Sequence, residues 1–589
     1  MKAFANIFTL SALAVCLTAC NDDIGTGSNV PAEESEGIYL KFALDLPSGS
    51  GSRSKTDTEE NEDYGSSSDG TEVGKDRENR ISQIMLVFTD EDNNYLTSTN
   101  VTSVSPTTST INEYIISIPP ERLADYVSPE PEQGEEAEQR IAYVYAYCNP
   151  TDELRALAGA AEGSTEVTNF IQKAHTITDS ENASVWQDNN FLMSNAVKHE
   201  ITLPESWNEN LSSGNPYDLT PTGPIKVERS VARFDYKAEY PDNIYRVRKS
   251  LSSKDDKDTD NPGIYIQLTD VALINMSKSF YYLRRVSKNG QNTEATICGV
   301  ETMNNYVVDT DAADKLNYAT ASNWPNKKGN FFYNLEESNT WKWTSLAAIS
   351  NNEEDNAIVP IDKKGYHIWR YAIENTIPQD ASETNTLQKN GITTGVVFRA
   401  KIGIDENYTG DQKVSWTPGK PIYVFRNVLY GDWDAIKKAY NENKLPTEVR
   451  IAYEAVESGD YSEKEAGFTE YKQNADGNYY AYYYYWNRHN DNGENGQSGK
   501  EDLVMGPMEF AVVRNNVYKL SVDAIFRFGY PEGEAPDPDT PDEEKPTPDP
   551  DEPDPEDPKV FLKVKVEVLP WVVRKNNIEF GNGDSGVID

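Results

Sequence analysis

The C-terminal end of the chain carries the feature that most constrains the fold. Residues 531–558 consist mainly of Pro, Asp and Glu, which is typical of an extended, self-repelling spacer. Residues 560–569 follow, and their apolar side chains alternate with charged ones, the period of a β-strand with one buried face. A single strand leaves its backbone groups unpaired and its apolar face in water. This tail therefore needs a sheet to join.

A matching strand is predicted directly after Gly37. Five apolar residues lie on one face of each segment: Ile38, Leu40, Phe42, Leu44 and Leu46 near the N-terminus, and Val560, Leu562, Val564, Val566 and Val568 in the tail. Because the two patterns agree, either segment suits the same groove. Burial of five such side chains contributes at most on the order of 10 kcal/mol before ordering costs.

The segment between the first strand and Arg80 is rich in Ser, Gly and acidic residues, which predicts an accessible loop. Proteolysis between Arg53 and Ser54 would detach the first strand, and Arg77 and Arg80 are alternative sites. The tail of another copy could then take its place by β-strand addition. A contact between two different surfaces does not close, so an open fibre is expected.

The same patterns allow a second interpretation. The tail could fold back on the second domain of its own chain as an edge strand, and Arg53 could be an ordinary loop residue. The sequence pattern leaves both interpretations open.

The N-terminus has the pattern of an export signal. Lys2 precedes an apolar run over residues 7–17, which is too short to span a bilayer. The run ends in Leu17-Thr18-Ala19-Cys20, which resembles a bacterial lipobox. Cys20 is therefore the predicted lipid site, and the lipid is the expected anchor to the membrane.

Composition favours an all-β protein. Tyr, Asn, Thr, Ser and Gly are abundant, which suits short strands joined by polar turns. The predicted parts are a signal peptide (1–20), a propeptide with the first strand (21–53), an N-terminal β domain (54–226), a C-terminal β domain (227–530), the spacer (531–558) and the tail (559–589). Helices are expected only near residues 152–161 and 433–443. The net charge of −42 argues against nucleic acid as a partner.

Nothing in the sequence points to catalysis, and no cofactor or metal is expected. The four histidines (His175, His199, His367 and His489) have no ligand spacing. Residues 256–261 match a calcium loop poorly, since Gln267 stands where the closing Glu is needed, and residues 491–496 match it less well, since Gly493 stands where a second ligand is needed. The aromatic run at 479–486 suits a buried strand better than a platform for sugars. Cys148 and Cys298 are predicted to be buried free thiols, although a disulfide between them is possible.

Several segments together resemble the major subunits of the type V pili of Bacteroidales, the short-fimbria fimbrillin family. They are the lipobox and residues 191–195, 227–236, 482–491, 513–520 and 570–573. The resemblance covers nearly the whole chain and implies two β-sandwich-like, transthyretin-like domains with few short helices. The spacer is longer than this family leads us to expect.

The resemblance also implies a course of assembly. A lipoprotein precursor modified at Cys20 would reach the outer membrane, be cut between Arg53 and Ser54 by an arginine-specific protease, and polymerise through the donor strand, including Trp571. The implied partners are copies of the chain itself and accessory anchor and tip subunits of a cell-surface fimbrium that supports adhesion. A lipid-anchored surface protein that binds glycan or a host protein and never polymerises is the alternative.

Overall fold

A computed structural model gives the fold of this chain. It describes residues 38–45, 74–101, 111–119, 122, 141–161, 173–187, 190–203, 214–250, 253, 255, 257–299, 306–316, 328–333, 341–350, 365–378, 392–410, 413–487, 489, 508, 510–533, 562–570 and 574–576. For the last two ranges it describes the backbone path. Cys20, Leu46, Arg53, Ser54, Val560 and Trp571 lie outside the described residues, and so does most of the spacer.

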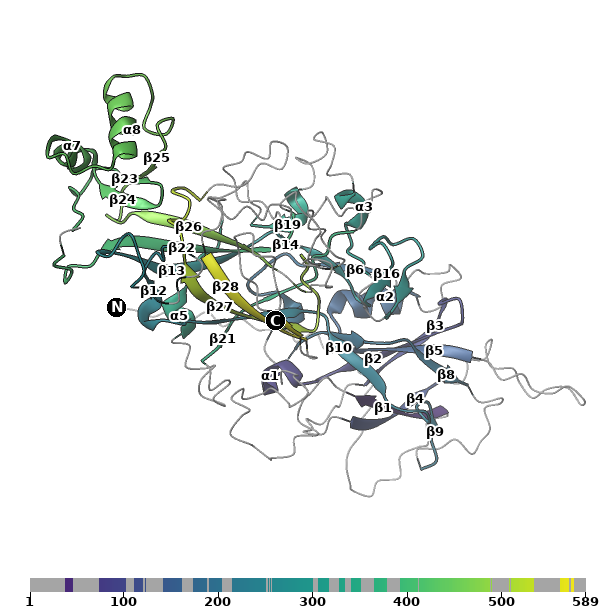
Figure 1. Ribbon diagram of the computed structural model, residues 1–589. Helices are drawn as coiled ribbons and strands as arrows, with labels where there is room; N and C mark the ends of the chain where they lie inside the picture. Colours follow the sequence, from purple (N-terminus) through teal and green to yellow (C-terminus); the bar gives the residue numbers. More distant parts are fainter. Residues whose placement is uncertain are drawn as a thin grey trace, which may run out of the picture.

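The prediction of a mainly β protein with few short helices is confirmed. Residues 38–229 form a first sheet in the strand order β3-β2-β5-β7-β10-β1-β4, with β8 beside β5 and β9 beside β1. Its strands are β1 (Ile38–Asp45), β2 (Ile84–Thr89), β3 (Tyr95–Val101), β4 (Ile111–Ile118), β5 (Ile141–Cys148), β7 (Met193–Asn195), β8 (His199–Thr202), β9 (Tyr217–Asp218) and β10 (Ile225–Arg229). This sheet occupies the lower right of Figure 1.

Two five-stranded sheets follow from Ala232 onward. One has the order β21-β11-β27-β28-β29, and the other has the order β12-β13-β22-β26 with β20 beside β13. Their strands are β11 (Ala232–Lys237), β12 (Ile244–Tyr245), β13 (Ile264–Ile274), β20 (Thr344–Ser345), β21 (His367–Ala372), β22 (Gly395–Ile404), β26 (Tyr480–Trp486), β27 (Asn516–Ile525), β28 (Leu562–Pro570) and β29 (Arg574–Asn576). Sheet membership thus changes between Arg229 and Ala232, within the segment 227–236. The domain boundaries stay a prediction.

Short ladders and helices complete the described fold. The ladders are β6 (Ala174–Thr176) with β15 (Ser279–Tyr281), β14 (Met276–Ser277) with β19 (Phe331–Phe332), and β16 (Arg285–Ser287) with β17 (Thr296–Ile297) and β18 (Tyr306–Val307). The helices are α1 (Asp76–Asn79), α2 (Asp152–Ala161), α3 (Ala312–Lys315), α5 (Leu346–Ser350), α7 (Trp433–Asn441) and α8 (Thr447–Glu457), with single 3-10 turns at Ser184–Trp186, Pro241–Asn243 and Lys328–Asn330. In the described part of the chain no helix combines the length and apolar character needed to cross a membrane.

Helices α7 and α8 belong to a small lobe that projects at the upper left of Figure 1. It contains the three-stranded sheet β24-β23-β25, with β23 at Ile422–Phe425, β24 at Val428–Gly431 and β25 at Phe468–Tyr471. The lobe has its own core, in which Ile436 and Tyr453 from the helices pack on Tyr423 and Phe468 from the strands. Helix α7 was expected from the sequence, whereas α8 was not.

The nine-stranded first sheet and the two five-stranded sheets share one continuous hydrophobic core. Buried residues of the first sheet, such as Phe42 and Val144, belong to the same cluster as Phe234, Phe398 and Leu520 from the later sheets. The aromatic run is part of the interior, as predicted: Tyr483 and Tyr485 are fully buried, and Tyr482 and Tyr484 pack against Trp341 and Trp343. Cys148 and Cys298 are buried free thiols, which confirms the prediction for them.

Candidate functional site

Strand β1 occupies an internal position in the first sheet. It runs antiparallel to β4 over its whole length, from the Ile38–Ile118 pair to the Asp45–Ile111 pair. On its other side it runs parallel to β9 and β10, with Leu40 opposite Tyr217 and Leu44 opposite Ile225. Among the described strands, β4 pairs with β1 alone. Removal of β1 would therefore open a groove with an unpaired backbone on both walls.

The buried face of β1 agrees with the sequence pattern. Leu40, Phe42 and Leu44 are fully buried and Ile38 is 4% exposed, while the residues between them are partly exposed. The Phe42 ring stacks on Tyr114 of β4 with a centroid distance of 5.3 Å. The strand is thus held by backbone ladders and by one apolar face, both of which another strand of the same pattern can supply.

The outer face of β1 carries one ion-pair cluster. Lys41 Nζ lies 3.1 Å from Asp218 of β9 and 3.8 Å from Glu113 of β4. The hydrogen bond to Asp218, together with the charges of Asp218 and Glu113, raises the pKa of Lys41 above its ordinary value. Nearby, the amide of Ala43 donates to Thr220 Oγ1 at 3.0 Å. The walls of the groove therefore present two carboxylates and a hydroxyl at its outer rim.

The tail strand β28 lies beside β27 of its own chain. The two strands are antiparallel, from the Asn516–Pro570 pair to the Ile525–Leu562 pair, with an irregularity between Val522 and Ala524. Val566 and Val568 stand opposite Leu520 and Tyr518, which are fully buried. This placement corresponds to the fold-back interpretation of the tail. The role of β28 as a donor to another subunit stays a prediction.

Behind the predicted cleavage loop, the chain is fastened by buried charge. Glu78 in α1 is fully buried, and its carboxylate lies 2.9 Å from Arg233 Nη1 of β11. Tyr371 Oη of β21 donates to the same carboxylate at 2.7 Å. The backbone carbonyl of Glu78 accepts from Arg229 Nε at 3.0 Å. We refer to Glu78, Arg229, Arg233 and Tyr371 as the α1 clamp.

Electrostatics explains why Glu78 can remain ionised inside the protein. Burial alone would raise the pKa of Glu78, but the charges of Arg233 and Arg229 and the hydrogen bonds from Tyr371 and the Lys75 amide lower it to about 2. Arg233 also forms a buried pair with Asp235 at 2.8 Å. A buried pair of this kind costs several kcal/mol to break when one partner is removed. The clamp therefore holds residues 74–80 firmly on β11 and β21.

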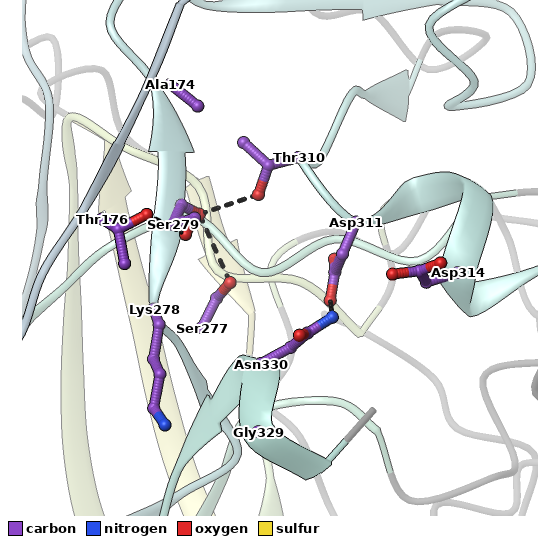
Figure 2. A pocket seen from close by; sticks show the side chains of 10 residues that line it. All are labelled: Ala174, Thr176, Ser277, Lys278, Ser279, Thr310, Asp311, Asp314, Gly329 and Asn330. Carbon is purple, nitrogen blue, oxygen red and sulfur yellow. Dashed lines mark hydrogen bonds between the residues drawn. The ribbon is translucent and has the colours of Figure 1, made fainter. Parts of the chain in front are cut away.

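A separate cavity of about 360 Å³ lies where β6 meets β15 (Figure 2). The polar groups of its lining include the hydroxyls of Thr176, Ser279 and Thr310 and the carboxylates of Asp311 and Asp314. Thr176 and Ser279 share a hydrogen bond of 2.7 Å, and Thr310 Oγ1 donates to the Ser279 carbonyl at 3.2 Å. The lining can offer hydrogen bonds to a small polar molecule. None of its residues was predicted as a site residue.

Burial and the charge of Asp309 raise the pKa of Asp311, at the edge of this cavity, to about 7. Lys315 lies 2.9 Å from Asp309 and 3.0 Å from Asp311, so two carboxylates share one ammonium group. Lys315 also donates to the Thr376 carbonyl at 2.9 Å. The cluster joins α3 to the segment after β21, which gives it a structural role in the fold.

The residues considered for metal binding are engaged in other contacts where they are described. Asp258 accepts from Ser253 Oγ at 2.6 Å, and Asp260 lies 3.0 Å from Lys249. His175 Nδ1 lies 2.6 Å from a Glu153 carboxylate oxygen. Within the described residues, no group of three or more His, Cys, Asp and Glu side chains is arranged to hold a metal ion.

The sequence interpretation missed the α1 clamp and the partners of Lys41. Arg229, Arg233 and Asp235 lie in the predicted strand segment 227–236, and charged residues among the apolar residues of such a segment are a signal for a buried ion-pair network. Their partner Glu78 is about 150 residues away in the sequence. Glu113 and Asp218 could not be predicted as the partners of Lys41, because this contact depends on which strands pair.

Comparison with known protein families gives a match to a fimbrillin model in the C-terminal part of the chain. Residues 477–577 match the model described as major fimbrial subunit protein type IV, fimbrillin, C-terminal. The matched region contains β26, β27, β28 and β29. The predicted resemblance to fimbrillins is thereby confirmed over this C-terminal part of the chain. Comparison with curated protein sequences gives no match.

Two solved structures from Porphyromonas gingivalis are similar to this chain at low sequence identity. A fimbrilin (FimA) of Porphyromonas gingivalis W83 has 13% identity and a TM-score of 0.37, over 91% of this chain and 98% of that one. A C-terminally truncated tip fimbrial protein, Mfa3 of Porphyromonas gingivalis, has 8% identity and a TM-score of 0.32, over 83% of this chain and 95% of that one.

Proposed function

We propose that this chain is a structural subunit of a cell-surface fimbrium that polymerises by β-strand exchange. One observation carries the proposal. Strand β1 is held between β4 and β9/β10 by backbone ladders and one apolar face, and the alternation of that face recurs in β28. An incoming tail can supply both kinds of interaction, with backbone hydrogen bonds giving affinity and alternate side chains giving specificity.

The internal position of β1 favours replacement over simple loss. If β1 left and nothing entered, β4 would lose the ladder partner that it has among the described strands. Ile116 and Ile118 of β4 and Ile225 of β10, all buried, would then border an open groove. Exposure of this apolar surface is unfavourable by about 25 cal/mol per Å². Entry of the tail strand of a second copy removes this cost, and repetition yields a fibre.

The α1 clamp supports Arg53 as the cleavage site over Arg77 and Arg80. A cut after Arg80 would separate Glu78 covalently from its clamp partners, and a cut after Arg77 would place a new ammonium group at buried Glu78. A protease also needs an accessible segment, whereas residues 76–79 are helical and packed. A cut between Arg53 and Ser54 leaves the clamp intact on the mature subunit.

The remaining steps follow from the sequence and the fimbrillin resemblance. The precursor is lipidated at Cys20, reaches the outer membrane, and loses residues 21–53 to an arginine-specific protease. The processed subunits then join one another and accessory anchor and tip subunits in a fimbrium that supports adhesion. The role is structural, without enzymatic activity, cofactor or nucleic acid.

The polar cavity beside β6 and β15 favours a second candidate, a lipid-anchored protein that binds a glycan or a host protein and does not polymerise. Hydroxyl and carboxylate groups of the kind that line it are suited to polar ligands. The two candidates differ in the fate of the precursor, since a binding lipoprotein keeps residues 21–53.

The substitution Arg53→Ala tests the proposal. We expect a full-length lipoprotein on the cell surface and little polymer, because β1 stays attached and keeps the groove filled. Arg77→Ala and Arg80→Ala are matched controls and should leave the amount of polymer unchanged. Normal fibres from Arg53→Ala, with loss of fibres in one of the controls, would move the cleavage site.

A further inference from the structure

The likeness between β1 and the tail extends to the face that does not enter the core. When Val560 is aligned with Ile38, the aromatic Phe561 falls on Tyr39, Lys563 on Lys41, and Glu567 on Asp45. The one change of charge is Lys565, which falls on Ala43. Apolar alternation explains the agreement on the buried face, but it does not require charges to agree on the other face.

The walls of the groove carry charges at the matching positions. In the register of β1, position 41 stands opposite Asp218 of β9, position 43 opposite Glu113 of β4, and position 45 opposite Lys226 of β10. Lys41 already pairs with Asp218 at 3.1 Å and lies 3.8 Å from Glu113. Loss of β1 would leave both carboxylates without the ammonium group that lies between them.

We propose that the tail of a second copy enters this groove in the direction and register of β1, with Lys563 opposite Asp218, Lys565 opposite Glu113 and Glu567 opposite Lys226. The inference rests on the proposed strand exchange and specifies its geometry. All three charged positions of the tail then face an opposite charge. Beside its own β27, the same three positions stand opposite Ala524, Ser521 and Lys519, so one of them faces an opposite charge.

Neighbouring registers are disfavoured by repulsion. A shift by two residues in one direction places Glu567 opposite Glu113, and a shift by two in the other direction places Lys565 opposite Lys226. A shift by one residue turns the apolar face outward. Each half-exposed charge pair changes the strength of the contact by at most about fivefold. The charged face therefore selects the register, while the apolar face supplies most of the affinity.

Disulfide trapping in full-length chains tests this register. Adjacent strands lie about 5 Å apart, which is within the Cα separation that a disulfide spans. In fibres from cells that express the double variant Glu567→Cys with Lys226→Cys, we expect a ladder of covalently linked subunits on a non-reducing gel. The matched control Lys565→Cys with Lys226→Cys should give no ladder, because those positions meet only after a shift by two residues.

A ladder from the control pair in place of the first pair would overturn the register, and a ladder from Phe561→Cys with Lys226→Cys would show the opposite strand direction. Either result would leave the proposed strand exchange intact. Fibres that contain none of these links would overturn the inference, and absence of any polymer from the wild-type chain would overturn the proposed function itself.

A charge swap gives a second readout that needs no new disulfide. Lys565→Glu should lower the resistance of the fibre to dissociation by up to about fivefold, and Glu113→Lys in the same chain should restore it. Ser117 lies on the same strand as Glu113 but stands opposite Tyr39. The matched control Ser117→Lys should therefore give no rescue, and equal rescue by both changes would contradict the register.

Discussion

The two flanks of the predicted cleavage loop are fastened in different ways. Before the loop, β1 is held by backbone ladders and by Leu40, Phe42 and Leu44, which any strand of suitable pattern could replace. After the loop, residues 74–80 are held by Glu78, whose buried carboxylate meets Arg233 and Tyr371. Under the proposed strand exchange, β1 is therefore the exchangeable part, and residues 74–80 stay with the mature subunit.

Deletion of the tail, residues 559–589, has the largest expected effect on fibre formation. The truncated chain should fold, be exported and be processed, yet form no fibre, because the groove of the next subunit stays empty. Its stability should fall only modestly, through the exposed edge of β27. Electron microscopy of surface material and thermal unfolding would measure the two effects. A truncated chain that fails to fold would favour the fold-back interpretation of the tail.

Substitutions by aspartate on the two faces of the tail should have unequal effects on polymerisation. Val564→Asp should nearly abolish polymer, because an unpaired carboxylate entering an apolar groove costs several kcal/mol. Lys565→Asp, at the neighbouring position on the opposite face, should cost about 1 kcal/mol or less. The yield of polymer from the two variants is the measurement. Equal defects would mean that the tail does not enter as a one-sided strand.

The stability of the folded chain should depend on the buried charge of Glu78. Glu78→Gln should lower the free energy of unfolding by about 3 kcal/mol, because it removes one of the buried carboxylates that offset the charges of Arg229 and Arg233. The exposed pair of Arg426 and Glu448 provides the control, and Glu448→Gln should cost less than about 1 kcal/mol. Chemical denaturation of the purified chains would separate the two. Similar losses would show that the clamp contributes no more than a surface pair.

The pH dependence of the clamp follows from the lowered pKa of Glu78. A carboxyl with a folded-state pKa of about 2 and an unfolded pKa of about 4.5 contributes stability that is fully present above about pH 4.5. This contribution, on the order of 3 kcal/mol, is lost as the pH falls toward 2. The difference in unfolding free energy between wild type and Glu78→Gln should therefore shrink between pH 5 and pH 2. A difference that stays constant over this range would contradict an ionised, clamped Glu78.

Local patterns in the sequence predicted individual elements well. Helix α2 begins and ends at the expected residues, strand β1 follows the predicted alternation, and β26 lies in the aromatic run that was predicted to be a buried strand. Helix α8 was missed, although Val449, Ala452 and Tyr453 have helical spacing and form its buried face. Short-range periodicity was the signal in each case.

Long-range pairing could not be predicted in the same way. The internal position of β1 depends on β4, β9 and β10, which are distant from it in the sequence. The sequences of these strands do not identify β1 as their partner. The alternation of the tail predicts one buried face, but it does not distinguish the sheet that contains β27 from the sheet that contains β1. For the same reason Glu78 and Arg233 were not recognised as partners, since each has meaning only once the fold brings them together.

The N-terminal sequence of this chain in purified surface fibres tests the central claim most directly. If β1 is the exchangeable strand and the α1 clamp stays with the body, the mature polymer begins at Ser54. A polymer that begins at Cys20 or Asn21 would show that β1 is retained, and one that begins at Glu78 or Ile81 would show that the cut falls at α1 and not at Arg53. Either result would contradict the account.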